Sequence, residues 1–337
     1  MEPYGNKVKI RHKIMSALPG IGRYTAGPYP VDSVKAAIKL SKEGYTGILN
    51  ILGEHDTDPI VIDATIKDYE QVIDEISKNK KNLLSPAISL KPTQFGFHET
   101  DKDGLVSKRL LSLIKKANQE GIFVWIDMEN KDTTEYTLSL YKSAITLFNP
   151  ELIGICVQAN LFRTKKDLEE LLEYSKKKAL VVNIRLVRGI YKEAKEFAYT
   201  KREQMHDELA RLMHMSFSKG GPKVKISIAS HHPLQIIRAI ALDKKYPGKL
   251  SGFQFLYGAV KKIPKILTQK GFKCTYYIPS GPRFFRYGVR RIRENPGALF
   301  GLMLSPLFEM GNATKITDYL DGKTKIDLEK ENLPMER

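Results

Sequence analysis

Arginine is concentrated in one short segment near the end of the chain. Between residues 283 and 294 the sequence RFFRYGVRRIRE carries five arginines. A helix would bring four of its side chains to one face through the i, i+3, i+4, i+7 pattern: Tyr287, Arg290, Arg291 and Glu294. Neighbouring guanidinium groups repel each other unless an anion lies between them, and their planar shape suits a carboxylate or a phosphate. We expect an anion clamp here; a solvated basic helix or a nucleic-acid surface is the alternative.

Three further charged residues lie at or inside apolar runs. Lys91 precedes Pro92 and can hold a carboxylate as a point charge, or it is a plain loop lysine. Asp127 follows the run VWI, and Arg185 lies inside the run 181–187. An unpaired buried charge is expensive, so we expect Asp127 to have a cationic partner and Arg185 to have Asp127 or a bound ligand as its counter-anion.

The histidines do not form a metal-binding motif. His231 and His232 are adjacent, so on a strand only one of them can face the interior, and His55 and His98 are remote in sequence. The sequence contains neither HxH nor HExxH. We therefore expect no metal, and a single histidine that donates a hydrogen bond to a cofactor is the better hypothesis.

The elements that position these residues alternate along the chain. Eight short apolar runs have the composition of buried strands: 47–53, 83–89, 122–128, 152–158, 181–187, 224–229, 252–256 and 274–278. Segments with helical periodicity lie between them: 61–77, 105–117, 133–148, 165–178, 193–217, 233–244 and 260–269. Helical crossovers of this length favour parallel pairing of the strands.

Eight strand–helix units predict a (β/α)8 barrel, with an open doubly wound sheet as the alternative. The sequence lacks GxGxxG and GxxxxGK[ST], which weakens a Rossmann or P-loop assignment. Barrels of this kind carry their chemistry at the carboxyl ends of the strands. Reactive residues follow or end six of the eight runs: Lys91, Asp127 with Glu129, Gln158 with Asn160, Arg185 with Arg188, Ser230 to His232, and Tyr277.

The predicted domain organisation has three parts. Residues 1–43 form an N-terminal extension that ends in an extra helix over 31–43, residues 44–311 form the catalytic barrel, and residues 312–337 form a C-terminal tail. The apolar segment 298–308 is about half the length that a membrane span needs. We therefore expect it to belong to a packed last helix, folded over the barrel mouth, rather than to a lipid anchor.

Composition constrains the class of protein more than its partner. The hydrophobic fraction of 42% and charged fraction of 28% in 337 residues describe a globular chain rather than a disordered or membrane-spanning one. The net charge of +17 favours anionic partners without choosing among nucleic acid, acidic lipid and carboxylates. Two cysteines, Cys156 and Cys274, are too few for a disulfide framework. We expect a cytoplasmic location, with peripheral contact at the inner face of the membrane as an option.

The strand-end motifs together resemble the FAD-dependent proline dehydrogenases. The matching strings occur in family order over nearly the whole predicted barrel: LNILGE at 49–54, SLKPTQ at 89–94, IDME at 126–129, VQA at 157–159, RLVRGIY at 185–191, ASH at 229–231, FQFLYG at 253–258, and YIP at 277–279 running into YGVRR at 287–291. Each string alone is weak. Their order makes the resemblance specific. Neither an aldehyde dehydrogenase module nor a DNA-binding arm adjoins the predicted barrel in this sequence, so we expect a monofunctional enzyme.

The resemblance implies oxidation of L-proline to Δ1-pyrroline-5-carboxylate, with a hydride passing to flavin N5. Asp127 and Arg185 would be the catalytic residues. The residues implied at the substrate are Lys91, Leu256, Tyr277, Tyr287, Arg290, Arg291 and Glu294. The residues implied at FAD are Ile126, Gln158, Arg185, Arg188, Gly189, Ile190, Tyr191, Ser230 and His231.

The sequence departs from the family pattern at three places. Arg188 stands where the family usually has Lys, Ile190 where it has Ala, and Ser230-His231-His232 where Thr-His-Asn is common. Arginine keeps the cation and can hold a phosphate with two donors, so FAD remains the expected cofactor. Ile190 adds bulk beside it.

Two other functions and the partners stay open at this point. A (β/α)8 lyase would use Lys91 as a Schiff base, and a basic RNA-binding protein would account for the net charge, although no nucleic-acid-binding motif is present and we expect no nucleic acid partner. For a proline dehydrogenase we expect a membrane quinone or a soluble carrier as electron acceptor, with partner subunits or a homo-oligomer as options.

Overall fold

The computed structural model describes residues 24–98, 101, 103–283 and 297–328, with the side chains of 297–308 left aside. Eight parallel strands in sequence order close into a barrel. They are β1 (Thr46–Ile51), β2 (Ala87–Leu90), β3 (Phe123–Ile126), β4 (Ile153–Gln158), β5 (Val182–Val187), β6 (Val224–Ala229), β7 (Leu250–Leu256) and β8 (Cys274–Ser280). The (β/α)8 prediction is confirmed, and the open sheet is wrong because β1 pairs with β8 as well as with β2.

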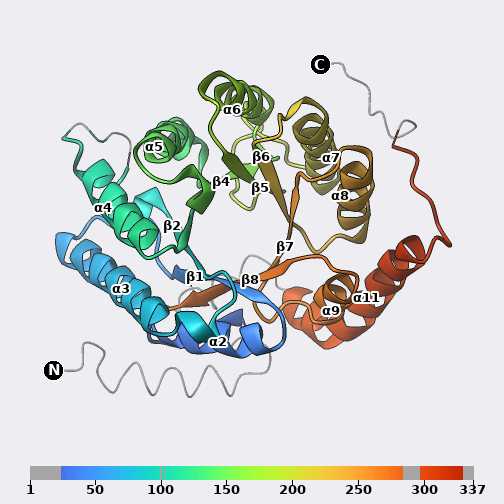
Figure 1. Cartoon of the computed structure of the whole chain (residues 1–337), viewed down its shortest axis with the longest axis horizontal. Coiled ribbons are helices and arrows are strands. Elements are labelled where there is room, and N and C mark those ends of the chain that lie inside the picture. Colours follow the sequence, from blue (N-terminus) through green and yellow to red (C-terminus); the bar gives the residue numbers. More distant parts are fainter. Residues whose placement is uncertain (1–23, 99–100, 102, 284–296, 329–337) are drawn as a thin grey trace. The chain divides into compact units, whose positions relative to one another are not determined.

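Helices connect the strands, and Figure 1 labels both. They are α2 (Asp32–Lys42), α3 (Pro59–Lys78), α4 (Leu105–Gln119), α5 (Thr134–Leu147), α6 (Thr164–Lys178), α7 (Arg202–Lys219), α8 (Pro233–Lys245), α9 (Lys262–Gln269) and α11 (Gly297–Leu320). Single 3₁₀ turns precede or follow several of them, among them η3 (Pro92–Phe95) directly after β2 and η4 (Lys131–Thr133) before α5. In the part of the chain that the structure describes, no helix combines the length and the apolar character needed to cross a bilayer.

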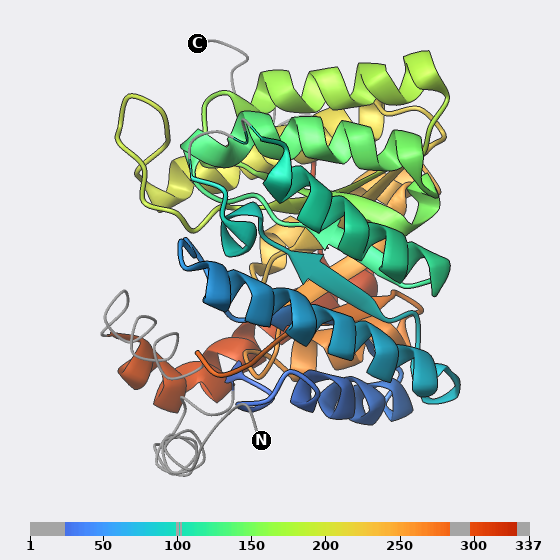
Figure 2. The ribbon, with the colours of Figure 1, turned by 90° about the vertical axis from the view of Figure 1, so that its left-hand side faces the viewer.

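Two compact units share these elements. The first unit comprises residues 1–124 and 255–311, and the second comprises residues 125–254 and 312–337. In the first unit α3 lies between α2 and α4, as two perpendicular views agree (Figures 1 and 2). In the second unit α5, α6, α7 and α8 follow one another beside β4, β5 and β6 (Figure 1).

The extra N-terminal helix is confirmed as α2, which packs against β1 and β8 in the first unit. Gly47 makes this close approach feasible, since a Cβ built there would lie 2.9 Å from Ile278 Cδ1 and 3.0 Å from Ala37 Cβ. The amide of Ala26 donates to the carbonyl of Pro279 at 2.8 Å, which ties the chain before α2 to the end of β8. The segment ahead of β1 is therefore part of this unit's core.

The long helix predicted over 193–217 begins later than expected, at Arg202. Residues before it pair with the segment that follows β4: Leu161 and Ala198 form an antiparallel bridge. The amide of Phe162 donates to Phe197 O at 3.0 Å, and the amide of Tyr199 donates to Asn160 O at 2.8 Å. These long-range bonds satisfy the backbone groups that a helix would otherwise use, so helical periodicity alone gave the wrong start.

The two cysteines, Cys156 and Cys274, are buried and free. Burial raises the pKa of both thiols, to about 11 for Cys274. A raised thiol pKa lowers reactivity at neutral pH. Both cysteines therefore serve as small apolar core residues.

Candidate active site

Arg185 and Asp127 form a buried ion pair in the second unit. The side chains are 5% and 9% exposed, and Arg185 Nη2 donates to Asp127 Oδ1. Arg185 lies in the middle of β5, opposite Cys156 of β4 and Ser227 of β6. The expectation that Asp127 has a cationic partner is confirmed, and Asp127 supplies a counter-anion for Arg185, which lowers the cost of burying both charges.

Trp125 and Gln254 also contact the Arg185 guanidinium. The Trp125 ring centroid lies 4.9 Å from Arg185 Cζ, and Gln254 Oε1 accepts from Nη1 at 3.4 Å. Sequence reasoning passed over both residues. The available signal was the two-residue spacing of Trp125 and Asp127, which places alternate side chains on one face of a strand. Ring stacking restricts the guanidinium plane and so fixes the directions in which it can donate.

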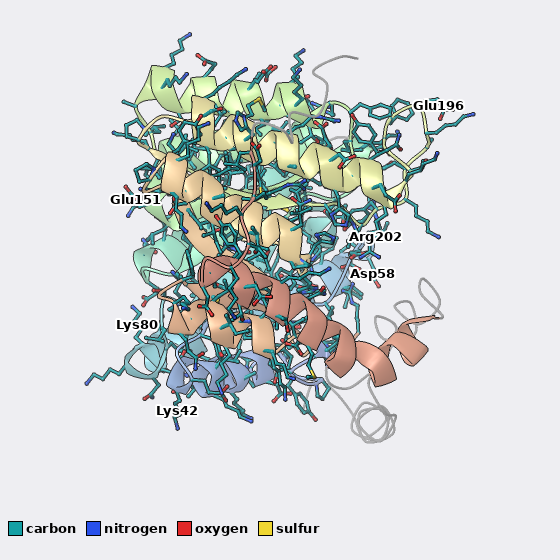
Figure 3. The ribbon with its side chains drawn as sticks, turned by 90° about the vertical axis from the view of Figure 1, so that its right-hand side faces the viewer. Lys42, Asp58, Lys80, Glu151, Glu196 and Arg202 are labelled. Carbon is teal, nitrogen blue, oxygen red and sulfur yellow. The ribbon has the colours of Figure 1, made fainter. Side chains whose placement is uncertain are left out.

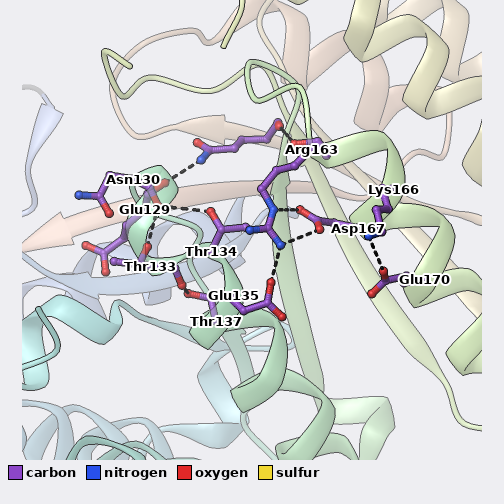
Figure 4. A network of polar contacts seen from close by, with 12 residues as sticks. Glu129, Asn130, Thr133, Thr134, Glu135, Thr137, Arg163, Lys166, Asp167 and Glu170 are labelled. Atoms are coloured by element: carbon purple, nitrogen blue, oxygen red, sulfur yellow. Dashed lines mark hydrogen bonds and ion pairs between the residues drawn. The ribbon is translucent and has the colours of Figure 1, made fainter. Parts of the chain in front are cut away.

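Gln158, the last residue of β4, is held through both its side chain and its backbone. Its Nε2 donates to the Glu129 carbonyl at 2.6 Å, and its own carbonyl accepts from Thr164 Oγ1 at 2.6 Å. Figure 4 shows the neighbouring contacts: Thr134 Oγ1 donates to the Asn130 carbonyl, and Arg163 bridges Glu135 and Asp167. With its nitrogen already committed, Gln158 can offer its side-chain oxygen to a ligand.

The turn after β5 forms a narrow backbone cradle. Gly189 has φ of +96°, and a Cβ there would lie 2.0 Å from Asn160 Oδ1, so only glycine fits. Asn160 Nδ2 donates to the Tyr191 carbonyl at 3.3 Å, while Asn160 Oδ1 is buried without a hydrogen-bond partner among the described residues. A buried polar atom of this kind is typical of a ligand site.

Arg188, in the same turn, is half-buried and has one hydrogen bond among the described residues, a 3.5 Å contact from Nε to the Gly189 carbonyl. Burial lowers the pKa of its guanidinium, and the nearby charge of Arg202 lowers it further. Within the described chain no carboxylate pairs with it at ion-pair distance. A desolvated cation beside a glycine turn fits a phosphate group, so the residues present are compatible with a phosphate-bearing cofactor.

The other residues predicted at the cofactor follow strand ends of the same unit. Ile126 is the buried last residue of β3, and Ser230 Oγ accepts from the amide of His232 at 3.1 Å. Ile190 is 59% exposed, so its added bulk lies at the surface of the turn rather than in the core. Tyr191 and His231 are both of intermediate exposure.

Lys91 and Tyr277 meet in the first unit. Lys91 Nζ donates to Tyr277 Oη at 3.0 Å and lies 5.6 Å from the ring centroid. Lys91 directly follows β2, and Tyr277 lies within β8, where its carbonyl accepts from the Tyr257 amide at 3.0 Å. Leu256, the last residue of β7, is 42% exposed. The unit thus offers a cation, a phenol and an apolar side chain.

The remaining predicted substrate residues, Tyr287, Arg290, Arg291 and Glu294, lie outside the described residues. The first arginine of that segment is described. Arg283 Nη1 binds both carboxylate oxygens of Asp56, at 2.6 and 2.7 Å, and joins the end of β8 to the loop after β1. Sequence reasoning did not foresee this pair. Among the described residues no group of three or more metal-ligating side chains is present.

Comparisons with known proteins agree with this architecture. A sequence model of the family "Proline dehydrogenase" matches residues 33–299. Proline dehydrogenase 1 of Bacillus subtilis subsp. natto is 28% identical over 283 residues, which are 82% of this chain and 87% of the relative. Proline dehydrogenase of Deinococcus radiodurans is 27% identical, over 81% of this chain and 86% of the relative.

The solved structures that match include proline utilization A (PutA) from Bdellovibrio bacteriovorus. It superposes with a TM-score of 0.76 at 21% identity over 96% of this chain, which spans 37% of that protein. At this identity the likeness concerns the fold, and it supports the closed barrel. Because the family match covers most of the sequence, this chain belongs to the proline dehydrogenase family of enzymes.

Proposed function

We propose that this enzyme oxidises L-proline to Δ1-pyrroline-5-carboxylate with FAD as the electron acceptor. The observation that carries the proposal is the buried pair of Arg185, inside β5, and Asp127, directly after β3, in a barrel whose sequence matches the proline dehydrogenase family over residues 33–299. In this proposal the catalytic part of the chain is the barrel at 44–311.

We assign the cofactor to side chains of the second unit. Arg185 would donate a hydrogen bond to the flavin near N5, and Asp127 supplies the counter-charge of its buried guanidinium. Gln158 offers its side-chain oxygen to the isoalloxazine, while Arg188 and the Gly189 turn hold phosphate. Five more residues complete the predicted set: Ile126, Ile190, Tyr191, Ser230 and His231. Bound FAD supplies the hydride acceptor.

We assign the substrate carboxylate to Lys91 together with Arg290 and Arg291. The Lys91 ammonium is oriented by its hydrogen bond to Tyr277, so it can meet a carboxylate without searching many rotamers. Leu256, Tyr277 and Tyr287 border the apolar ring, and Glu294 orients the arginines. A small rigid substrate held by its carboxylate presents a fixed C–H bond, which converts binding into orientation.

The proline nitrogen must be neutral before a hydride leaves the adjacent ring carbon. The reaction therefore releases one proton from nitrogen in addition to the transferred hydride. Because the neutral amine becomes more abundant as pH rises, kcat/KM is expected to increase with pH until an enzyme group deprotonates. A profile that stays flat from acidic to alkaline pH would contradict this requirement.

The electrons leave the enzyme to a second acceptor, for which we propose a membrane quinone or a soluble carrier. The net charge of +17 supports transient contact with an acidic membrane leaflet. Binding of purified enzyme to anionic vesicles, compared with neutral vesicles at the same salt concentration, tests that contact.

Anaerobic titration of the purified holoenzyme with L-proline tests the activity. We expect a yellow protein whose flavin absorbance bleaches in proportion to added proline, and D-proline as the matched control should leave it oxidised. A colourless protein, or a flavin that proline does not bleach, would refute the proposed function.

A further inference from the structure

Two histidines meet between α7 and α8 of the second unit. His206 lies in the second turn of α7, and His232 immediately precedes α8. Their ring centroids are 4.6 Å apart with an interplanar angle of 37°. His206 Nδ1 and Nε2 and His232 Nδ1 are all buried and have no hydrogen-bond partner among the described residues. The side chains thus bring several unused polar atoms to one place.

Several cationic side chains lie near the histidine pair and come from different elements. The charges that act on the two rings come from Arg188 after β5, Arg202 at the start of α7, Arg238 on α8 and Lys315 on α11. Arg202 is labelled in Figure 3. Burial first, and then these charges, lower the pKa of His206 to about 4 and also lower that of His232. These shifts favour the neutral form of both imidazoles.

A neutral imidazole carries one N–H donor and one acceptor nitrogen, and leaving them unpaired in a buried place costs free energy. Gln235 adds another unpaired polar atom. Its Nε2 donates to the His206 carbonyl at 2.9 Å, while its Oε1 has no hydrogen-bond partner among the described residues. Proteins keep such groups where a ligand or a bound water completes them. The unpaired ring nitrogens therefore indicate a ligand.

The charge of the site selects the kind of ligand. A divalent metal would meet two imidazoles but also the repulsion of the surrounding guanidinium groups, and no third metal-ligating residue joins them in the described structure. An anion gains from each of these cations. Phosphate oxygens accept hydrogen bonds from guanidinium and imidazole N–H groups alike, so a phosphate-bearing ligand satisfies both the donors and the charge.

We propose that His206 and His232 form a phosphate-binding site with Arg188 and Arg202. This inference rests on the proposed function, because Arg188 is also the residue that we assign to the FAD phosphates. The site accepts either the diphosphate of FAD or free phosphate, which share the same oxygen chemistry. His206 and His232 become protonated as the anion binds, so binding takes up protons and strengthens as pH falls.

Measuring FAD release from the holoenzyme tests whether the ligand of this site is the diphosphate of FAD rather than free phosphate. Dilution of wild type, His206→Asn and His232→Asn enzymes, followed by the rise in free flavin fluorescence, gives the dissociation constant. We expect each variant to hold FAD about tenfold more weakly, as the loss of one charge-assisted hydrogen bond implies. Wild type should also hold FAD several-fold more tightly at pH 6 than at pH 8, and both variants should show a smaller difference.

The matched control is His214→Asn, which changes an exposed histidine on the same helix. It should retain FAD as wild type does. His206→Gln provides a second variant that keeps a polar side chain if His206→Asn does not fold. Circular dichroism and thermal melting compare the folding of all variants.

Calorimetry with inorganic phosphate tests whether the holoenzyme binds free phosphate at this site. If the variants keep FAD normally but the holoenzyme loses a phosphate-binding event that wild type has, the site takes free phosphate. If neither FAD release nor phosphate binding changes in folded variants, the proposal is overturned. Because none of these measurements uses proline, a failure of proline to reduce the flavin would refute the proposed activity and leave the phosphate site standing.

Discussion

Arg185 of β5 and Asp127 after β3 share one buried ion pair that neither strand could accommodate alone. The Trp125 ring covers the guanidinium from one side, with its centroid 4.9 Å from Cζ. The pair also lowers the cost of burying each charge, because each is the other's counter-ion. The interior of β5 thus carries a fixed, paired cation.

Replacement of Asp127 by Asn should destabilise the fold as well as impair turnover. The substitution removes the counter-charge of Arg185 while both side chains remain buried, and breaking a buried pair in this way costs about 3 to 5 kcal/mol. Urea unfolding monitored by circular dichroism measures the free energy of unfolding.

Glu135→Gln is the control for that measurement. Glu135 also accepts a hydrogen bond from an arginine, Arg163, but its side chain is 82% exposed. Its loss should cost at most about 1 kcal/mol. If Asp127→Asn and Glu135→Gln lowered the free energy of unfolding equally, burial of the Arg185–Asp127 pair would make no difference to its effect on stability.

Lys91 variants distinguish a carboxylate-binding lysine from a Schiff-base lysine. Lys91→Met removes the cation and should raise the KM for proline by about 10- to 100-fold, the worth of one hydrogen bond to a charged group. Lys91→Arg keeps the positive charge and should retain part of the binding. Steady-state kinetics with separate kcat and KM values measures both.

A Schiff base would respond differently, because arginine cannot form an imine with a carbonyl substrate. Complete loss of turnover in Lys91→Arg, with the flavin still bound, would therefore contradict carboxylate binding. Tyr277→Phe is the matched control for orientation: it removes the 3.0 Å hydrogen bond to Lys91 Nζ while keeping the ring.

The pair of Arg283 and Asp56 should position the segment that follows it in the chain. Arg283 is held at both carboxylate oxygens, and Nη2 reaches Thr65 Oγ1 at 3.4 Å. Asp56→Asn should cost about 1 to 3 kcal/mol of stability and raise the KM for proline, because Arg290 and Arg291 follow Arg283 closely in sequence. Unchanged KM in a variant with the expected stability loss would limit Arg283 to a structural role.

The fold was predictable because its signal is local and repeated. Each buried strand is an apolar run, and each crossover helix carries a 3.6-residue period, so the eight-fold alternation could be read without any long-range information. The start of α7 could not be predicted in this way. The backbone hydrogen bonds of Phe162 and Tyr199 connect two segments that are distant in sequence, and helical periodicity carries no information about such contacts. A local pattern indicates what a segment prefers, and tertiary bonds decide where it begins.

The candidate site also combines contacts that a local sequence pattern predicts with contacts that depend on tertiary packing. The pairing of Arg185 with Asp127 was predictable because a charge within an apolar run demands a partner. The pairing of Arg283 with Asp56 joins residues 227 positions apart, and neither residue lies inside a buried strand where its charge would demand a partner. The contact of His206 with His232 depends on how α7 packs on α8, which no motif encodes.

The two neutral histidines predict how stability depends on pH. The pKa of His206 is about 4 in the folded protein and near 6.5 when exposed in the unfolded chain. Between these values the unfolded state binds a proton that the folded state does not, so the free energy of unfolding falls as pH decreases from about 6.5 to 4. His232, whose pKa is also lowered, adds to the same trend. Because the rings are half-buried, water screens part of the effect.

Urea unfolding of the flavin-free protein at several pH values measures this trend. His206→Asn should show a shallower decline of stability below pH 6.5 than wild type, whereas His214→Asn, with its exposed ring, should follow wild type. Bound FAD should reduce the decline in wild type, since phosphate oxygens stabilise the imidazolium that acid creates. A wild-type decline that persists unchanged in His206→Asn would assign the acid sensitivity to other groups and remove His206 as its source.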